Sequence, residues 1–381
     1  MGGTCELTVD LDAINANLRL AARLAGGRTV LAAVKANAYG HGLVPVARSI
    51  EHSGSAQWLG VATVSEAVAL RAAGITLPIL KFTITLPDEL PEALGADIVF
   101  TVGDEEAIDH LQRAASAVGI VAAVHLKIDT GMRRIGAHPA DASRLARLIA
   151  DSTSLELGGI YTHLPVSDTG DGDAFTRGQF AAIAAAARDV EAAVGPLEHV
   201  HAANSAAVLG HDLTGTSMVR PGIMVYGSYP DPSTPRAHAL APVLRWTSRV
   251  AFIKQVLAGE TVGYGRDWTA PRDTWVATVN VGYGDGYSRL LSNRGHMLVD
   301  GTPRPVVGRV CMDQTMIDLG PEVPTVRVGD EAVLVGRSGE HEISVEDVAA
   351  LMGSITYEVT CLITDRVHRR HVGGVSPSST R

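Results

Sequence analysis

The chain has 381 residues, of which 46% are hydrophobic and 19% are charged, and its formal net charge is -9. This length predicts two domains, because a single hydrophobic core rarely grows beyond about 250–300 residues. A nucleic-acid or anionic-membrane partner would call for a basic surface, and no run of five or more Lys and Arg residues occurs, so we expect neither partner.

The cysteines and the N-terminal residues bear on the cellular compartment. Cys5, Cys311 and Cys361 are odd in number and far apart, which favours neither a disulfide framework nor a metal site with closely spaced ligands. No stretch approaches about 18 apolar residues, and the sequence MGGTCELTVD lacks a basic segment followed by an apolar one. We therefore expect a cytoplasmic protein with no bound metal.

Short apolar runs alternate with helical stretches between residues 29 and 227. Eight runs read as strands: TVLAAVK, WLGVAT, LPILKFT, ADIVFTV, VAAVHLKID, LELGGIYTH, EHVHAAN and SMVRPGIMVYG. Helical segments lie between them, such as SEAVALRAAG, DEEAIDHLQRAASAVG, PADASRLARLIADS and FTRGQFAAIAAAARDVEAAVG. Eight strand–helix repeats over this length favour a (β/α)₈ barrel of the TIM type over an open doubly wound sheet.

The pattern changes after the proline-rich segment 228–242. Longer alternating runs follow: VLRWTSRVAFIKQV, TWVATVNVGYG, HMLVDGTPRPVVGRVCMDQTMIDLG and EAVLVG. One helical stretch, SVEDVAALMG, interrupts them. This pattern is typical of β structure. We expect an α/β chain with a TIM-like barrel over residues 1–240 and a mostly β C-terminal domain over residues 241–381.

Polar residues follow several predicted barrel strands, at the end where barrel enzymes place reactive groups. Lys35 is unusual because it ends an apolar run, and burying an ammonium is costly unless the amine is neutralised, paired or used covalently. With a serine and a glycine-rich turn near the last two strands, it suggests covalent attachment of pyridoxal phosphate, and an ordinary ion pair is the alternative. The strand-end residues are Lys35, Tyr39, Lys127, Arg134, His163, Asn204, Ser205, Arg220 and Gly222.

Seven spaced motifs resemble those of the alanine racemases, in the same order and across nearly the whole chain. They are AVKANAYGHG, KIDTGMRRIG, RPGIMVYG, VGYGRDW, VGYGDGYSR, GRVCMDQ and ITYEV. The resemblance implies a fold-type III enzyme that uses pyridoxal 5′-phosphate to interconvert L- and D-alanine. It also implies a homodimer in which two subunits share each active site. The substrate would be a small amino acid, and the product D-alanine would be a peptidoglycan precursor.

The resemblance also assigns roles to single residues. Lys35 would carry the cofactor, and Tyr264 would reach in from the partner subunit as the second acid/base. Lys127 matches a lysine that is carbamylated in many members; the alternatives are that it pairs with Asp129 or stays unmodified. The cofactor-binding set would be Lys35, Tyr39, His163, Asn204, Ser205, Arg220, Gly222, Ile223 and Tyr357; the substrate would contact Arg134 and Met312; an access channel would contain Tyr283, Arg289 and Arg309.

Racemisation requires a proton to leave one face of the substrate and return on the other, so two groups on opposite faces are needed. Lys35 and Tyr264 are the candidates. Arg220 fits the same scheme if it faces the ring nitrogen of the cofactor, because a guanidinium neither accepts nor readily gives up a proton.

Departures from the family pattern leave the substrate open. ILKFTITLPDELP stands where an aliphatic-Gly continuation is usual, HLPVSD replaces HFA-type residues at 163–168, and MRR replaces Met-small-Arg. Lys81 and Arg133 could therefore alter the pocket. The alternatives are a racemase for serine or another polar or basic amino acid, and a protein that binds the cofactor without catalysis.

Overall fold

The computed structural model describes residues 4–374, which form two compact units. We call them the barrel unit, with residues 13–38 and 42–241, and the β unit, with residues 4–12, 39–41 and 242–374.

Eight parallel strands of the barrel unit close into a barrel, because the first of them pairs with the last. This confirms the predicted TIM-like architecture. The strands are β2 (Thr29–Ala33), β3 (Trp58–Val61), β4 (Ile79–Ile84), β5 (Val99–Val102), β6 (Ala122–Lys127), β7 (Leu155–Tyr161), β8 (His199–His201) and β9 (Met218–Val219).

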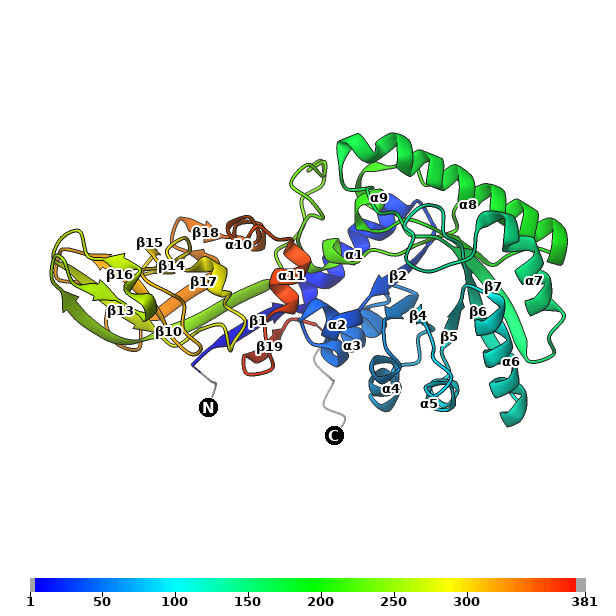
Figure 1. Ribbon diagram of the computed structural model, residues 1–381, viewed down its shortest axis with the longest axis horizontal. Coiled ribbons are helices and arrows are strands. Elements are labelled where there is room, and N and C mark those ends of the chain that lie inside the picture. The colour runs from blue at the N-terminus through cyan, green and yellow to red at the C-terminus, as the bar shows by residue number, and fades with distance from the viewer. Residues whose placement is uncertain (1–3, 375–381) are drawn as a thin grey trace. The chain divides into compact units, whose positions relative to one another are not determined.

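Helices cover the outside of this barrel, as α6, α7 and α8 show in Figure 1. Helix α6 begins where the predicted signal stands: the Asp104 side chain accepts a hydrogen bond from the Ala107 N–H, and Gly119 ends the helix with a φ of 70°. The helices are α1 (Leu11–Ala25), α2 (Lys35–Tyr39), α3 (Leu43–Ser53), α4 (Val64–Ala72), α5 (Leu90–Gly95), α6 (Glu105–Val118), α7 (Ala142–Ala150), α8 (Asp173–Val194) and α9 (Ser205–Gly210), with short 3₁₀ turns η1 (Pro139–Asp141), η2 (Gly170–Gly172) and η3 (Ile223–Tyr226).

The barrel interior holds both apolar and polar side chains. Leu31, Leu80 and Met218 form a fully buried apolar cluster. Buried polar side chains also come from the strands, among them Thr101, His125, Tyr161 and His201. Buried polar groups are stable mainly when they are hydrogen-bonded, and here Thr101 bonds to Tyr161 and His125 bonds to His201.

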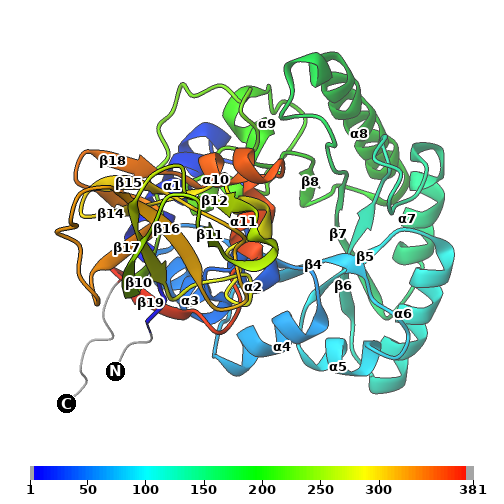
Figure 2. The ribbon, with the colours of Figure 1, turned by 60° about the vertical axis from the view of Figure 1, so that its left-hand side comes forward.

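The β unit is built on a nine-stranded sheet whose main path runs β15-β14-β17-β10-β1-β19 (Figure 2). Its strands are β1 (Glu6–Asp10), β10 (Leu244–Val256), β13 (Thr274–Val279), β14 (His296–Val299), β15 (Thr302–Pro305), β16 (Thr315–Gly320), β17 (Glu331–Ser338), β18 (His341–Ile343) and β19 (His368–Val372), and β11 (Thr261–Val262) pairs separately with β12 (Trp268–Thr269). Val256, Val262, Ala270, Val276 and Val307 form one of its buried apolar clusters.

The β unit has two features that the sequence patterns did not indicate. Strand β1 pairs with β10 and β19, so residues 4–12 join the β unit although the sequence grouped them with the barrel. The unit also has two α-helices, α10 (Val345–Met352) and α11 (Thr356–Cys361), where the sequence indicated one. Helix α11 has six residues and no side-chain cap at its start, so it carried no helix signal. The turns η4 (Tyr264–Arg266) and η5 (Arg289–Leu291) complete this unit.

Candidate active site

The polar residues predicted at the barrel strand ends lie at one end of the barrel. Lys35 follows β2, Lys127 ends β6, His163 follows β7, Ser205 follows β8 and Arg220 follows β9. All eight strands are parallel, so these residues share the carboxyl-terminal rim where barrel enzymes build their active sites.

The backbone turns sharply after Lys35. Ala36, Asn37 and Ala38 have φ values of 53°, 54° and 53°, so the start of α2 is a left-handed turn. L-residues rarely adopt this conformation because Cβ approaches the following carbonyl oxygen. The Val34 N–H donates to the Gly60 carbonyl at 2.9 Å before the turn, and the Ala36 N–H donates to the Glu66 carboxylate at 2.6 Å within it.

Arg220 is the centre of a buried hydrogen-bond network. Its Nη1 donates to His201 Nδ1 at 2.8 Å, and its Nη2 donates to the carbonyls of Thr162 at 2.8 Å and Ala202 at 3.1 Å. Because His201 Nδ1 accepts, its Nε2 carries the proton and donates to His125 Nδ1 at 2.9 Å. This chain of bonds fixes the guanidinium and the tautomer of His201.

The charges in this network follow from burial. Burial lowers the pKa of Arg220 to about 10, so it stays cationic at neutral pH. Burial, together with the positive charge of Arg220, lowers the pKa of His201 well below its usual range. Burial also lowers the pKa of His125, to about 3. Arg220 is therefore a fixed cation at one end of a chain of two neutral histidines.

Lys127 lies beside the same network. Its Nζ is 3.9 Å from the centre of the Tyr161 ring, which stacks in parallel on the His201 ring at 4.6 Å. The Tyr161 hydroxyl is 2.7 Å from the Thr101 hydroxyl, and burial raises the pKa of Tyr161 to about 12. Burial and the charges of Arg220 and Arg134 lower the pKa of Lys127 well below its usual range, which favours a neutral, nucleophilic amine.

The Arg220 guanidinium has no carboxylate counter-ion among residues 4–374. Neither Lys127 nor Arg220 forms an ion pair there, and the nearby Asp129 accepts from the Gly131 N–H at 2.8 Å instead. Burial and the charge of Arg220 lower the pKa of His163 well below its usual range, and the charge of Lys35 contributes to this. A buried cation without a counter-ion is costly, so the rim around Arg220 suits a ligand with negative charge.

Ser205 connects the last two strands of the barrel. Its hydroxyl accepts from the Gly222 N–H at 2.8 Å and from the Met224 N–H at 3.3 Å, and Ile223 begins the turn η3 between them. A hydroxyl among backbone N–H groups can hold phosphate oxygens.

The amide of Asn204 is occupied within the fold. It accepts from the Ser167 hydroxyl at 2.9 Å and the Ala207 N–H at 3.1 Å, and it donates to the Leu164 carbonyl at 3.3 Å. Asn204 therefore caps the start of α9, and its side chain holds the segment after β7 close to Ser205.

The remaining predicted site residues belong to the β unit. Tyr39 and Tyr357 lie together there, with ring centres 6.0 Å apart, and burial raises the pKa of Tyr39. Tyr283 and Met312 are neighbours on two adjoining loops: the Tyr283 N–H donates to the Cys311 carbonyl, and the Met312 carbonyl accepts from Gly284. Arg289 is exposed at the start of η5.

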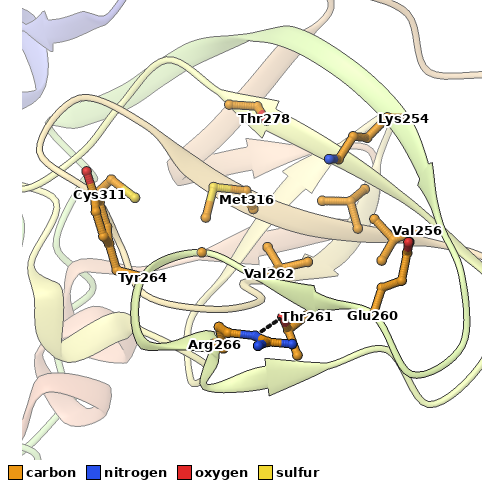
Figure 3. A pocket seen from close by; sticks show the side chains of 12 residues that line it. Lys254, Val256, Glu260, Thr261, Val262, Tyr264, Arg266, Thr278, Cys311 and Met316 are labelled. Carbon is orange, nitrogen blue, oxygen red and sulfur yellow. Dashed lines mark hydrogen bonds between the residues drawn. The ribbon is translucent and has the colours of Figure 1, made fainter.

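Tyr264 is 72% exposed, at the rim of a cavity of about 740 Å³ (Figure 3). Gly263 and Gly265 flank it with φ values of 76° and 74°, so its short turn depends on glycine. In Figure 3 Tyr264 and Cys311 lie at one end of the cavity and Lys254 and Glu260 at the other. Arg309 packs behind this turn and forms an ion pair with Asp267.

Sequence reasoning missed three members of the barrel site: His125, Tyr161 and His201. Each lies within an apolar strand run and so looks like a core residue. The only signal for them is the alternation of side chains along a strand, which would place these residues on the inward face.

Two departures from the family pattern, Lys81 and Arg133, differ in burial. The Lys81 side chain is 2% exposed. Its Nζ donates to the Thr83 hydroxyl at 2.9 Å and to the Ile84 carbonyl at 3.0 Å. Arg133 is exposed.

The described part of the chain offers neither a membrane-spanning helix nor a cluster of metal ligands. None of the helices in residues 4–374 is long and apolar enough to cross a membrane. The same residues contain no group of three or more His, Cys, Asp and Glu side chains that could hold a metal ion.

Comparison with known proteins places this architecture in one family. The model of the alanine racemase N-terminal domain matches residues 9–230, and that of the alanine racemase C-terminal domain matches residues 243–371. The chain is 48% identical to the alanine racemase of Cutibacterium acnes, over 96% of this chain and 97% of that one. It is 43% identical to the alanine racemase of Symbiobacterium thermophilum, over 96% of each chain.

Solved structures agree with these sequence matches. The crystal structure of alanine racemase from D-cycloserine producing Streptomyces lavendulae superposes with a TM-score of 0.90 at 37% identity, covering 97% of both chains. The structure of alanine racemase from Bacillus anthracis with bound L-Ala-P gives a TM-score of 0.90 at 34% identity, covering 98% of this chain and 96% of that one. With matches to both domains and along almost its whole length, the chain belongs to the alanine racemase family.

Proposed function

We propose that the protein interconverts L- and D-alanine and uses pyridoxal 5′-phosphate as its cofactor. The observation that carries the proposal is the buried Arg220 cation near Lys35, which has no carboxylate partner in the described chain and so suits a ligand with negative charge, such as a phosphorylated cofactor. When bound, the cofactor delocalises negative charge from the substrate α-carbon.

In this proposal Lys35 holds the cofactor through its amine. Ser205, with the backbone of Gly222 and Ile223, binds the phosphate, and Tyr39 and Tyr357 complete the phosphate site. Arg220 faces the ring nitrogen: its Nε–H donates to no group among residues 4–374, whereas both of its terminal nitrogens are engaged. His163 lies against Arg220 and the ring, and Asn204 acts by capping α9 beside Ser205.

Lys35 and Tyr264 are proposed to move the proton, one on each face of the substrate. Arg134 and Met312 contact the substrate, and Tyr283, Arg289 and Arg309 form the access channel. We further propose a homodimer in which Tyr264 serves the site of the partner subunit. The exposure of Tyr264 supports this, because an acid/base needs surroundings that fix its position and its proton affinity.

Lys127 is proposed to be carbamylated. A neutral amine adds to the carbon of carbon dioxide and releases one proton to solvent, and the resulting carbamate would place a negative charge among Arg134, Arg220 and Lys35. From the family alone we propose a cytoplasmic enzyme that supplies D-alanine as a peptidoglycan precursor.

A racemisation assay tests the activity. Purified enzyme with pyridoxal 5′-phosphate is incubated with L-alanine, D-alanine and the other common amino acids, and chiral chromatography follows both enantiomers. We expect conversion in both directions with the highest kcat/KM for alanine, because a misfit of one methylene in a small pocket costs about 1–3 kcal/mol. A higher kcat/KM for serine, lysine or arginine would contradict the proposed substrate.

A labelling experiment tests the attachment site. Borohydride reduction of the loaded enzyme followed by peptide mapping is expected to mark Lys35. A mark on Lys127 or Lys81 in place of Lys35 would overturn the assignment.

A further inference from the structure

The Glu66 carboxylate bridges the ends of two neighbouring barrel strands. One oxygen, Oε1, accepts from the Ala36 N–H at 2.6 Å, after β2. The other, Oε2, accepts from the N–H groups of Ala62 at 2.8 Å and Thr63 at 3.2 Å, after β3. Ala36 directly follows Lys35, so Glu66 is hydrogen-bonded to the peptide group that leaves the candidate cofactor lysine.

Helix capping accounts for only part of this arrangement. Glu66 and Thr63 form a capping box at the start of α4, in which Glu66 Oε2 accepts from the Thr63 N–H and the Thr63 hydroxyl accepts from the Glu66 N–H. The capping box of α10 uses the same pattern, with Asp347 Oδ2 accepting from the Ser344 N–H. Capping α4 therefore leaves the bond from Ala36 to Oε1 without an explanation.

The segment that receives this bond is strained. Ala36, Asn37 and Ala38 form a left-handed turn, which L-residues adopt only when surrounding contacts impose it. The Asn37 side chain accepts from the Leu43 N–H at 2.8 Å and holds the end of the turn. The Ala38 N–H donates to the Val34 carbonyl at 2.8 Å across the start of the turn, and the Ala36 N–H bond to Glu66 adds a charged side-chain contact there.

We propose that Glu66 is a positioning residue for Lys35. Through the Ala36 N–H it holds the left-handed turn, and the turn sets the direction in which the Lys35 side chain leaves the strand. The inference rests on the proposed function, in which Lys35 carries the cofactor. Charged carboxylates make the stronger hydrogen bonds to backbone N–H groups, which suits a clamp on a strained turn.

The first test compares Glu66→Gln with Thr63→Ala in the enzyme loaded with pyridoxal 5′-phosphate. An amide of the same size offers one acceptor oxygen, so Glu66→Gln cannot serve both strands. Thr63→Ala weakens the same capping box but keeps the carboxylate on Ala36. We expect kcat to fall about tenfold or more in Glu66→Gln, in line with a lost charged hydrogen bond, with KM changed far less. Thr63→Ala is expected to stay within about twofold of the original enzyme.

Hydrogen exchange gives a readout that does not depend on catalysis. Mass spectrometry of the peptide spanning residues 34–42 is expected to show exchange about tenfold faster in Glu66→Gln than in Thr63→Ala. Equal exchange and equal kcat in the two variants would overturn the inference.

A double substitution tests the link to backbone strain. Glycine adopts a positive φ without penalty, so Ala36→Gly added to Glu66→Ala is expected to restore kcat several-fold over Glu66→Ala alone. No gain in the double variant would show that Glu66 acts only as a helix cap.

The outcomes separate this inference from the proposed function. If the original enzyme carries no cofactor on Lys35, the proposed function fails, while hydrogen exchange still decides whether Glu66 holds the turn. If the cofactor is on Lys35 and the Glu66 variants behave like Thr63→Ala, the inference fails and the proposed function stands.

Discussion

The two units differ in how they hold their candidate catalytic residues. In the barrel unit, Arg220, His201 and His125 are buried and joined by successive hydrogen bonds. In the β unit, Tyr264 is exposed and stands between two glycines with positive φ. The barrel site is thus preorganised within its own unit, whereas Tyr264 needs further surroundings to act as an acid/base. Substitutions in each unit should therefore have different consequences.

Removal of Lys35 should have the largest effect. Lys35→Ala is expected to lose covalent attachment of the cofactor and to lower racemisation by about 10³-fold or more, because one residue provides both attachment and proton transfer. Tyr264→Phe is expected to lower kcat by about 10²–10⁴-fold and to retain the cofactor. Absorption spectra and borohydride mapping of both variants check this. Loss of the cofactor in Tyr264→Phe would contradict the view that the barrel unit holds the cofactor without help from Tyr264.

Mixed dimers test whether the two residues come from different chains. Dimers of Lys35→Ala alone or Tyr264→Phe alone should be nearly inactive. In a two-fold dimer with shared sites, a mixed pair places both lesions in one site and leaves the other intact. Random exchange makes about half of the dimers mixed, with half of their sites intact, so activity should return to about a quarter of that of the original enzyme.

The measurement is racemisation after mild dissociation and reassociation of an equal mixture, with subunit exchange followed by mass spectrometry. Exchange without recovery would mean that Lys35 and Tyr264 serve the same chain's site, or that Tyr264 is not the second base.

The free energy of unfolding should separate Arg220 from Arg134, two of the arginines that the sequence proposed for the site. Arg220→Met leaves His201 Nδ1 and two buried carbonyls without donors, and each unsatisfied group is expected to cost about 1–3 kcal/mol of unfolding free energy. Arg134 is exposed, so Arg134→Met is expected to change stability by less than about 0.5 kcal/mol while raising KM. Urea unfolding of both variants is the check, and equal losses would show that the Arg220 network does not stabilise the barrel.

These contrasts also show what the sequence could predict. The barrel followed from local signals: eight apolar runs, and helix boundaries such as Asp104 and Gly119 around α6. The roles proposed for Lys35 and Arg220 came from motifs shared with the family. His201 and His125 could not be predicted, because their bond joins strands 76 residues apart. The second function of Glu66 was hidden for a similar reason: its sequence context predicts a helix cap, and only folding brings Ala36 to its other oxygen.

The pairing of β1 with β10 depends likewise on contacts between distant segments. The left-handed turn gave no signal, because alanine carries no preference for a positive φ and glycine would have been the expected residue.

The smallest expected effect is the pH dependence of stability that the barrel histidines impose. Burial lowers the pKa of His125 to about 3, below the value of about 6.5 in an unfolded chain. The unfolded chain therefore binds a proton more readily between these two values, and the folded state loses stability as the pH falls from about 6.5 towards 3. Each such histidine contributes up to about 1.4 kcal/mol per pH unit to the slope of the unfolding free energy against pH within that window.

Urea unfolding at several pH values between 7 and 5 should show a shallower slope of the unfolding free energy against pH for His125→Gln than for the original protein. His52→Gln, which changes an exposed histidine, serves as the control and should leave the slope unchanged. An unchanged slope in His125→Gln would mean that the barrel interior admits a proton at His125 without cost, against the neutral, hydrogen-bonded network that holds Arg220.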